Sequence, residues 1–430
     1  TNKEALTYLE ERTVPTKKHP NPKYPIFEGV QTNIRRSAIN KAVGMVKSYL
    51  SNLYNWHKEG KELGHNNPSY PKPKNYSLTY YSTDVEFENI LQERTKKPFV
   101  RIKIVDEKGQ YKKVNYPVLP YKRFYERLNK FLGEGWKIKR TATLIKKGKD
   151  YYIAILLEKT VKKPNPKEPR YIINIDLNIQ RNIATIGIYE IDWKEKEAKF
   201  YGIKFIGGDL SRLAYKRDYL LHHIQIKQKQ TGRSPEKGDN KRLWNKVNNI
   251  NRDIALKVAN EISKIAEELK EKGEVIVVFE KLTGLRARKG KGKKLNKKLN
   301  YWLRRAIVEK VKEKGLERGY KVDEIYPQYT SKRCSRCGLL GERFSPNGST
   351  ALFGCKYCGY IVNTDVNAVF NQFFIYLSYL LKAGREARYG TSFKSSLDFF
   401  VLKLVPPVVR VGASLKSSKG SFQKSMVVYK

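Results

Sequence analysis

Cysteine, histidine and long apolar runs are scarce in this chain of 430 residues, and each shortage excludes a class of protein. All four cysteines lie between residues 334 and 358, so no disulfide framework can extend over the chain. The longest apolar stretch, Phe370 to Leu381, is interrupted by Asn371, Gln372 and Ser378. It is shorter than the roughly 20 apolar residues that span a bilayer. We therefore expect neither a disulfide-rich secreted protein nor a membrane-spanning one.

Acidic residues are also scarce relative to basic ones. The chain has 87 lysines and arginines against 42 acids, a formal net charge of +45. Such an excess of one sign is self-repulsive unless a polyanion neutralises it. The basic residues run through the whole chain, which predicts a long nucleic acid that contacts several domains.

The cysteines that are present have the spacing of a zinc site. They form two C-x2-C pairs with seventeen residues between them: Cys334, Cys337, Cys355 and Cys358. Two such pairs place four thiolates on tight turns, as tetrahedral Zn2+ requires. Gly338 and Gly359 directly follow the second cysteine of each pair, where the turn commonly needs a positive φ. The five histidines lie elsewhere, so we predict a structural zinc ion with four thiolate ligands; two disulfides are the alternative.

Hydrophobic periodicity in the first part of the chain changes from helical to extended. Residues 1–30 are rich in proline and lysine and are predicted to be loop. Apolar residues recur every three to four positions from Asn33 to Trp56, which predicts a helix. From about residue 77 to 160 the pattern alternates and includes hairpin turns, which predicts a small β-barrel or β-rich module.

The pattern becomes mixed α/β from Tyr171 onward. Tyr171–Leu177 and Val275–Phe279 are nearly continuous apolar runs, which predict buried strands. The other strands are expected at 184–188, 199–206 and 321–325, and the helices at 243–269, 301–317 and 365–382.

Three acids occupy positions where a structural acid is unusual. Asp176 interrupts an apolar strand, Glu280 ends another, and Asp365 lies at a predicted helix start. A buried acid is costly unless it is paired or bound to a metal. Three carboxylates converging at one point suit two Mg2+ or Mn2+ ions ~4 Å apart, which could activate water and stabilise a leaving oxygen of a phosphodiester. The alternatives are a helix cap for Asp365 and salt bridges for the other two.

The motifs around these acids resemble those of TnpB proteins, the OrfB products of insertion sequences, which are related to compact CRISPR effectors. The stretches that carry the resemblance occur in the family's order: Asn174–Asn178 and Asn182–Thr185 for the first RuvC motif, Val278–Leu282 for the second, Tyr329–Gly338 for the start of the zinc ribbon, and Asp365–Ala368 with Asn371 for the third.

This resemblance implies an RNase H-like (RuvC) nuclease that is guided by an RNA and cuts double-stranded DNA beside a short flanking motif. Asp176, Glu280 and Asp365 would be its magnesium ligands, and residues 281–300, with nine basic residues and no acids, would form a lid. Two residues depart from the family pattern: Asn178 replaces a glycine and Asn363 replaces an acid, and either change could lower activity. The family's first barrel strand and first helix are expected to precede Thr1. The resemblance also implies a prokaryotic, cytoplasmic protein associated with the nucleoid.

The same resemblance implies a multidomain organisation. The expected divisions are a helical recognition-like segment (1–76), a wedge-like β-barrel (77–165), a RuvC-like nuclease (168–327), a zinc ribbon (328–362), the third-motif helix (363–384) and a basic tail (385–430). The basic residues expected to contact nucleic acid are Arg35, Arg36, Lys41, Arg242, Lys246, Arg286, Arg288 and Lys289.

Three alternatives to a transposon-encoded, RNA-guided endonuclease remain open. One is a compact CRISPR effector of the same ancestry, which a neighbouring CRISPR array would reveal. Another is a nuclease-inactive, guided DNA-binding protein, which the presence of all three acids disfavours. The last is a guide-free transposase or junction resolvase, which RNase-insensitive activity would support.

Overall fold

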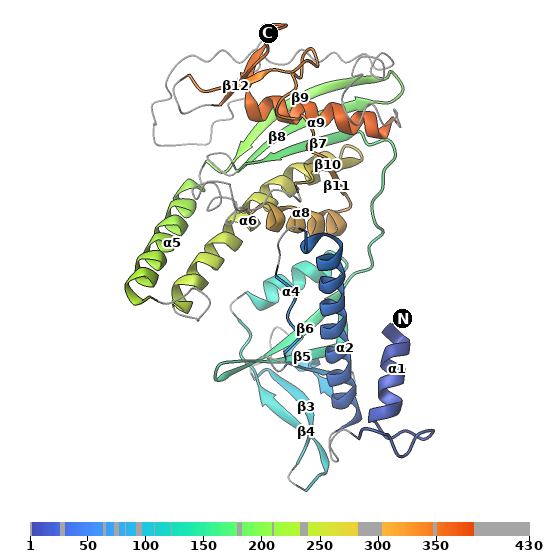
Figure 1. Cartoon of the computed structure of the whole chain (residues 1–430). Coiled ribbons are helices and arrows are strands. Elements are labelled where there is room, and N and C mark those ends of the chain that lie inside the picture. The colour runs from blue at the N-terminus through green and yellow to red at the C-terminus, as the bar shows by residue number, and fades with distance from the viewer. Residues whose placement is uncertain are drawn as a thin grey trace. The chain divides into compact units, whose positions relative to one another are not determined.

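The structure is a computed structural model, and it divides into two compact units, Thr1–Thr160 and Val161–Lys430, which we describe separately (Figure 1). Among the residues it describes, no helix is long and apolar enough to cross a membrane. It describes residues 2–25, 31–62, 66–72, 77–81, 83–91, 97–106, 108–121, 123–178, 183–208, 210–232, 240–282, 303–346 and 351–381.

Helices begin the first unit. The helix predicted at 33–56 is confirmed as α2 (Thr32–Asn55), which continues into a π-helical turn, η1 (Trp56–Gly60). The loop predicted for residues 1–30 is wrong in part, because Asn2–Thr13 form α1. The Arg36 guanidinium of α2 forms an ion pair of 2.9 Å with Glu10 of α1.

The β-rich part of the first unit contains two three-stranded sheets, with strand orders β1-β5-β6 and β2-β3-β4. Their apolar residues form one core cluster, which includes Tyr80, Val100 and Ala142. The predicted β-rich module is confirmed, whereas the pairings of the described strands form two separate sheets and do not confirm a barrel. The elements are β1 (Ser77–Tyr80), β2 (Val85–Glu86), α3 (Glu88–Leu91), β3 (Phe99–Val105), β4 (Tyr111–Pro117), α4 (Phe124–Gly133), β5 (Lys137–Lys147) and β6 (Asp150–Glu158).

A five-stranded sheet organises the second unit, with strand order β11-β10-β7-β8-β9. The central strands β7, β10 and β11 are parallel, and β8 and β9 continue the sheet in antiparallel fashion. This confirms the α/β class and each strand predicted from Tyr171 onward. The strands are β7 (Tyr171–Leu177), β8 (Ala184–Asp192), β9 (Glu197–Ile206), β10 (Val275–Glu280) and β11 (Lys321–Ile325).

Helices cover both faces of this sheet. One face carries Ile173, Ile175 and Val277 of the strands. The apolar face of α6 (Lys241–Lys270) and part of α8 (Arg304–Arg318) pack against these residues. On the other face α9 (Thr364–Leu380) packs against Ile172 and Val278. Helix α5 (Ser211–Thr231), which the sequence did not predict, runs beside α6 (Figure 1).

The cysteine-rich segment between β11 and α9 is a small antiparallel sheet of β12 (Glu342–Phe344), β13 (Leu352–Gly354) and β14 (Ile361–Asn363). Phe353 and Val362 of this segment join the core cluster under α9. The ribbon is therefore packed onto the five-stranded sheet rather than standing apart from it. Most of the predicted lid (281–300) and the whole predicted tail (385–430) lie outside the described residues.

Candidate active site and metal centre

The four predicted zinc ligands come together. Their sulfur atoms all lie within 4.8 Å of one another, with Cys334 Sγ 3.6 Å from Cys358 Sγ and Cys337 Sγ 3.5 Å from Cys355 Sγ. All four are free thiols, so the disulfide alternative is wrong in this structure. Within the described part of the chain, no other group of three or more cysteine, histidine or acidic side chains is clustered this tightly.

The two cysteine turns have the same backbone geometry. Gly338 N–H donates to the carbonyl of Cys334, and Gly359 N–H donates to that of Cys355, at 2.9 and 3.0 Å. Both glycines have positive φ values, 78° and 67°, as the sequence predicted. Two turns of this kind, facing each other with four sulfur ligands, fit a closed tetrahedral Zn2+ site.

The thiols differ in how readily they would lose a proton. Burial raises the pKa of Cys334 well above its ordinary value. Burial also acts on Cys355, but backbone N–H groups of Cys358 and Tyr357 outweigh it and lower the pKa of Cys355 to about 7. A thiol with that pKa is about half thiolate at neutral pH, and the thiolate is the form that binds metal.

Asp176 and Glu280 lie at the same end of neighbouring parallel strands. The register of β7 and β10 pairs Ile175 with Phe279, so the next residue of each strand is one of the two acids. Side chains alternate between the faces of a sheet, which places both acids on the face that Ile172 and Val278 share with α9. Asp176 is half-buried, and the buried Glu280 is only 8% exposed.

Asp365 approaches from the first turn of α9. The helix cap is Asn363, whose Oδ1 accepts hydrogen bonds from the backbone N–H groups of Asp365 (2.9 Å) and Val366 (3.4 Å). The prediction that Asp365 itself caps the helix is therefore wrong, because Asn363 is the N-cap residue. Burial raises the pKa of Asp365, and the charge of Arg343 and the Asn178 side chain oppose this in part. Asn178 Nδ2 itself forms no hydrogen bond of standard geometry.

The three acids interact electrostatically. Burial raises the pKa of Asp176 well above its ordinary value, and the charges of Glu280 and Asp365 raise it further. Burial also raises the pKa values of Glu280 and Asp365. The protein thus gathers carboxylates without fully compensating their charge, which is the electrostatic condition that a bound divalent cation relieves.

Arg343 is a site residue that the sequence did not reveal. Burial raises the pKa of Asp176, Glu280 and Asp365, and the positive charge of Arg343 opposes this rise at all three, so Arg343 lies near enough to interact with each acid. The residue is exposed and belongs to β12, which means that the cysteine-rich ribbon supplies a cation to the carboxylate site.

Glu280 is held by further residues that sequence reasoning also missed. The buried Gln372 of α9 donates a hydrogen bond of 3.2 Å to Glu280 Oε1. Hydrogen bonding by Thr330 and Gln372 lowers the pKa of Glu280, although burial outweighs it. Gln372 Oε1 has no hydrogen-bond partner among the described residues, so an acceptor remains available beside the carboxylate.

Helix α9 also holds the chain that leads into the first cysteine turn. Asn367 accepts a hydrogen bond from Ser335 N–H (3.0 Å) and donates to the carbonyl of Arg333 (2.8 Å). Asn371 donates to the carbonyls of Thr330 and Arg333, both at 2.7 Å. One helix therefore binds the segment around Cys334 and also carries Asp365.

The basic residues predicted to contact nucleic acid are not gathered at one place by the structure. Arg35, Arg36 and Lys41 lie on α2 of the first unit, and Arg242 and Lys246 are exposed on α6 of the second. Arg286, Arg288 and Lys289 lie outside the described residues. Their role in nucleic-acid binding stays a prediction.

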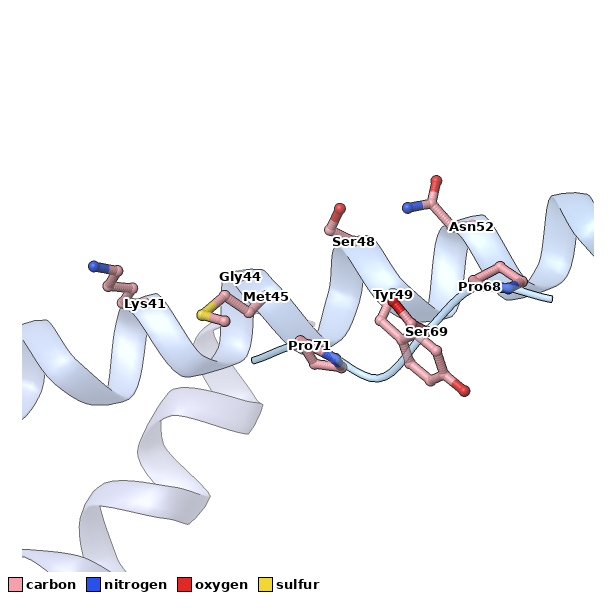
Figure 2. A pocket seen from close by; sticks show the side chains of 9 residues that line it. All are labelled: Lys41, Gly44, Met45, Ser48, Tyr49, Asn52, Pro68, Ser69 and Pro71. Atoms are coloured by element: carbon pink, nitrogen blue, oxygen red, sulfur yellow. The ribbon is translucent and has the colours of Figure 1, made fainter. Parts of the chain in front are cut away.

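A hollow of about 610 Å³ lies along α2, far in sequence from the carboxylates. Lys41, Ser48 and Asn52 line it from the helix, and the segment around Pro68 and Pro71 runs beside them (Figure 2). The Tyr49 ring stacks on Tyr70, with 5.2 Å between ring centroids. The Lys41 ammonium already donates to Ser77 Oγ at 3.0 Å.

Several segments of the chain are similar to known protein families and proteins. Residues 1–106 match the Aq_aa04 family, and residues 305–372 match the Cas12f1-like TNB domain. The uncharacterized protein aq_aa04 of Aquifex aeolicus is 60% identical over 105 residues, which are 24% of this chain and 60% of that protein. The TnpB-like protein aq_aa05 of the same organism is 62% identical over 295 residues, 69% of this chain and 90% of that protein.

Among solved structures, the fold resembles that in a Cas12f1–sgRNA–target DNA complex, with a TM-score of 0.52 and 16% sequence identity. The match covers 78% of this chain and 70% of that one. The likeness therefore shows an α/β fold similar to that of Cas12f1, and residues 305–372 match the Cas12f1-like TNB domain. The sequence places the chain more narrowly: the chain belongs to the TnpB-like protein family.

Proposed function

We propose that this protein is an RNA-guided DNA endonuclease, encoded by a transposon, with a RuvC-like nuclease domain. The observation that carries the proposal is the convergence of Asp176, Glu280 and Asp365 at one end of the sheet. Membership of the TnpB-like family and the likeness to a Cas12f1 fold support it. The strand order, with antiparallel β8 and β9 beside parallel β7 and β10, supports an RNase H-like arrangement.

The carboxylates would hold two Mg2+ or Mn2+ ions, because hard oxygen ligands suit these cations. Bound there, the metal supplies the activation of water and the stabilisation of a phosphodiester leaving group. The four thiolates would hold Zn2+ and take no part in the reaction.

The residues around the carboxylates prepare them for this task. Gln372 holds Glu280 in place, and Asn363 fixes the turn that carries Asp365. Arg343 would contact a non-bridging phosphate oxygen of bound DNA, a role that its electrostatic influence on the carboxylates supports. A guide RNA and double-stranded target DNA would account for the net charge of +45.

A cleavage assay with the RNA that co-purifies tests the proposal. We expect Mg2+-dependent cutting of DNA matched to that RNA, and loss of cutting with retained binding for Asp176→Ala. The half-buried acid Asp253 on α6, which pairs with Lys257, provides the matched control Asp253→Ala. Undiminished cutting by Asp176→Ala would contradict the assignment of the active site.

The same experiment separates the alternatives. Binding without cutting by the unchanged protein would identify a nuclease-inactive, guided DNA-binding protein. Activity that survives RNase treatment would indicate a guide-free nuclease. A co-purifying RNA that derives from a CRISPR array, and not from a transposon end, would identify a compact CRISPR effector.

A further inference from the structure

The match to the Aq_aa04 family divides this chain inside its first unit. The proteins aq_aa04 and aq_aa05 of Aquifex aeolicus are separate, and each is at least 60% identical to this chain over the residues that it matches. The Aq_aa04 family match ends at residue 106. That residue begins the turn between β3, which ends at Val105, and β4, which begins at Tyr111.

The strands of the first unit lie on both sides of this division. The Aq_aa04 match includes β1, β2 and β3. The match to aq_aa05 spans 295 residues of a chain of 430. Whether it begins at the first possible residue or at the last, it includes residues 136–295, and hence β5 and β6. The division does not follow the boundary between the two compact units at residue 160.

Strands on opposite sides of this division pair with each other. Residues 77–80 of β1 pair with 142–145 of β5, and residues 99–105 of β3 pair with 111–117 of β4. The hydroxyls of Thr79 and Thr143 lie 3.2 Å apart across the first pairing. Each side alone would expose two unpaired strand edges and half of a shared apolar core.

Residues 1–106 also form hydrogen bonds with one another. The buried Asp84 carboxylate accepts hydrogen bonds from Gln31 (2.5 Å) and Asn33 (2.6 Å), which join β2 to the start of α2. Ser37 Oγ of α2 accepts from the backbone N–H of Thr79 at 3.1 Å. These bonds lie wholly within residues 1–106, so a break after that point leaves them intact.

The turn at the division is a suitable place for a chain break. Lys108, Gly109 and Gln110 are exposed, and Gly109 has a φ of 76°. Asp106 Oδ1 accepts from the N–H groups of Lys108 and Gln110, but no residue of the core cluster lies in the turn. Exposed turns of this kind tolerate nicks because few contacts are lost.

We propose that residues 1–106 form a separable docking piece whose partner is a polypeptide carrying β4, β5 and β6, and that the two associate through strand pairing without a covalent link. The docking surface is the edge of β3, the edge of β1 and the apolar residues between them. The proposal does not depend on whether the protein cuts DNA, because association is measured directly.

The experiment uses the full-length chain with a specific protease site inserted between Lys108 and Gly109. After complete cleavage, we expect the two pieces to co-elute on gel filtration in a 1:1 ratio, at the elution volume of the uncut variant. The pieces are then separated in urea, mixed and diluted, and we expect the complex to re-form. Separation of the pieces upon cleavage, or failure to re-form, would overturn the proposal.

A charge exchange tests whether the strand interface itself holds the pieces. Glu86 of β2 forms an ion pair with Lys113 of β4 across the division. Glu86→Lys should raise the apparent dissociation constant of the cut pieces about two- to five-fold. Adding Lys113→Glu should restore it. An unchanged constant in both variants would show that the pieces do not associate through this interface.

Discussion

The second unit contains two candidate metal sites that are built in opposite ways. The four cysteine sulfurs lie within 4.8 Å of one another on two matching turns, and backbone N–H groups prepare Cys355 for the thiolate form. The three carboxylates are less tightly grouped and raise the pKa of Asp176 through mutual repulsion. The first arrangement suits a permanent metal that fixes structure, and the second suits a metal that works with a substrate.

The two sites are nevertheless joined by one helix. Helix α9 carries Asp365 in its first turn and binds the segment around Cys334 through Asn367 and Asn371. The ribbon in turn supplies Arg343 to the carboxylates. We therefore expect one site to stabilise the structure and the other to carry the reaction. Changing each site and measuring both activity and stability tests this difference.

The largest effect is expected at the carboxylates. Asp176→Asn should lower the rate of DNA cutting at least ~1,000-fold, because removing one member of a catalytic group disables the group. Folding should not suffer, since the substitution removes a carboxylate whose charge the folded protein does not compensate. Cleavage rates and melting temperatures measured side by side test this. A variant that is both inactive and strongly destabilised would contradict the contrast between the two sites.

The cysteine site should show the reverse order of effects. Cys355→Ser should lower the free energy of unfolding of the second unit by several kcal/mol, because zinc binding contributes directly to folding. Cutting should fail as a consequence of lost structure. The matched control is Tyr357→Phe, which changes an exposed side chain on the same turn. Metal analysis should find one zinc per chain, and a folded sample with far less zinc would refute the structural role.

Arg343 tests whether the ribbon takes part in the reaction. Arg343→Gln should lower the cutting rate about 100- to 1,000-fold if its charge stabilises the reacting phosphate. Because Arg343 lowers the pKa of the three acids, its loss should also let Mg2+ bind more tightly. A slower rate with a lower Mg2+ requirement is the expected combination. Lys356→Gln, in an exposed ion pair of the same ribbon, serves as the control.

The sequence predicted some parts of this arrangement to the residue and missed others for identifiable reasons. Strands β7 and β11 begin and end where expected, since an apolar run such as Tyr171–Leu177 has one clear interpretation. Helix α5 was missed because few of its residues are buried, among them Leu220 and Ile224, while Tyr215 is exposed. Its sequence therefore lacks a clear apolar stripe.

The site was predictable only as far as its acids and thiols. Arg343 is one of 87 lysines and arginines, and only the folding of the ribbon brings it near the carboxylates. Gln372 did leave a signal, because a polar residue within an apolar helix needs a partner, and that partner is Glu280. The carboxylate roles themselves stay predictions until cutting is measured.

A smaller effect is expected where α9 connects the two sites. Asn367→Ala removes the hydrogen bonds to Ser335 N–H and to the Arg333 carbonyl, so we expect a loss of about 1–3 kcal/mol in stability. Cutting should fall about tenfold as Asp365 loses its fixed position, with zinc still bound at one per chain. Ser378→Ala, which removes only a bond within the same helix, is the control. Loss of zinc would show that Asn367 supports the cysteine site instead.

The smallest effect concerns pH and stability without Mg2+. The pKa values of Asp176, Glu280 and Asp365 are raised on folding, so the folded protein holds these protons more tightly than the unfolded chain. Their contribution favours folding at acidic pH and is lost as the pH rises from the ordinary carboxyl pKa values through the raised ones. Magnesium should therefore raise the melting temperature more at pH 7 than at pH 5.

Saturating Mg2+ at 100 times its dissociation constant should contribute about 2.7 kcal/mol at neutral pH. Asp176→Asn removes one of the three titrating groups and should reduce both the pH dependence and the Mg2+ response. The cysteine site provides the internal comparison, because its thiols should respond to a zinc chelator and not to Mg2+. An equal Mg2+ response at both pH values would mean that the carboxylates are compensated within the protein, and the contrast between the two sites would no longer hold.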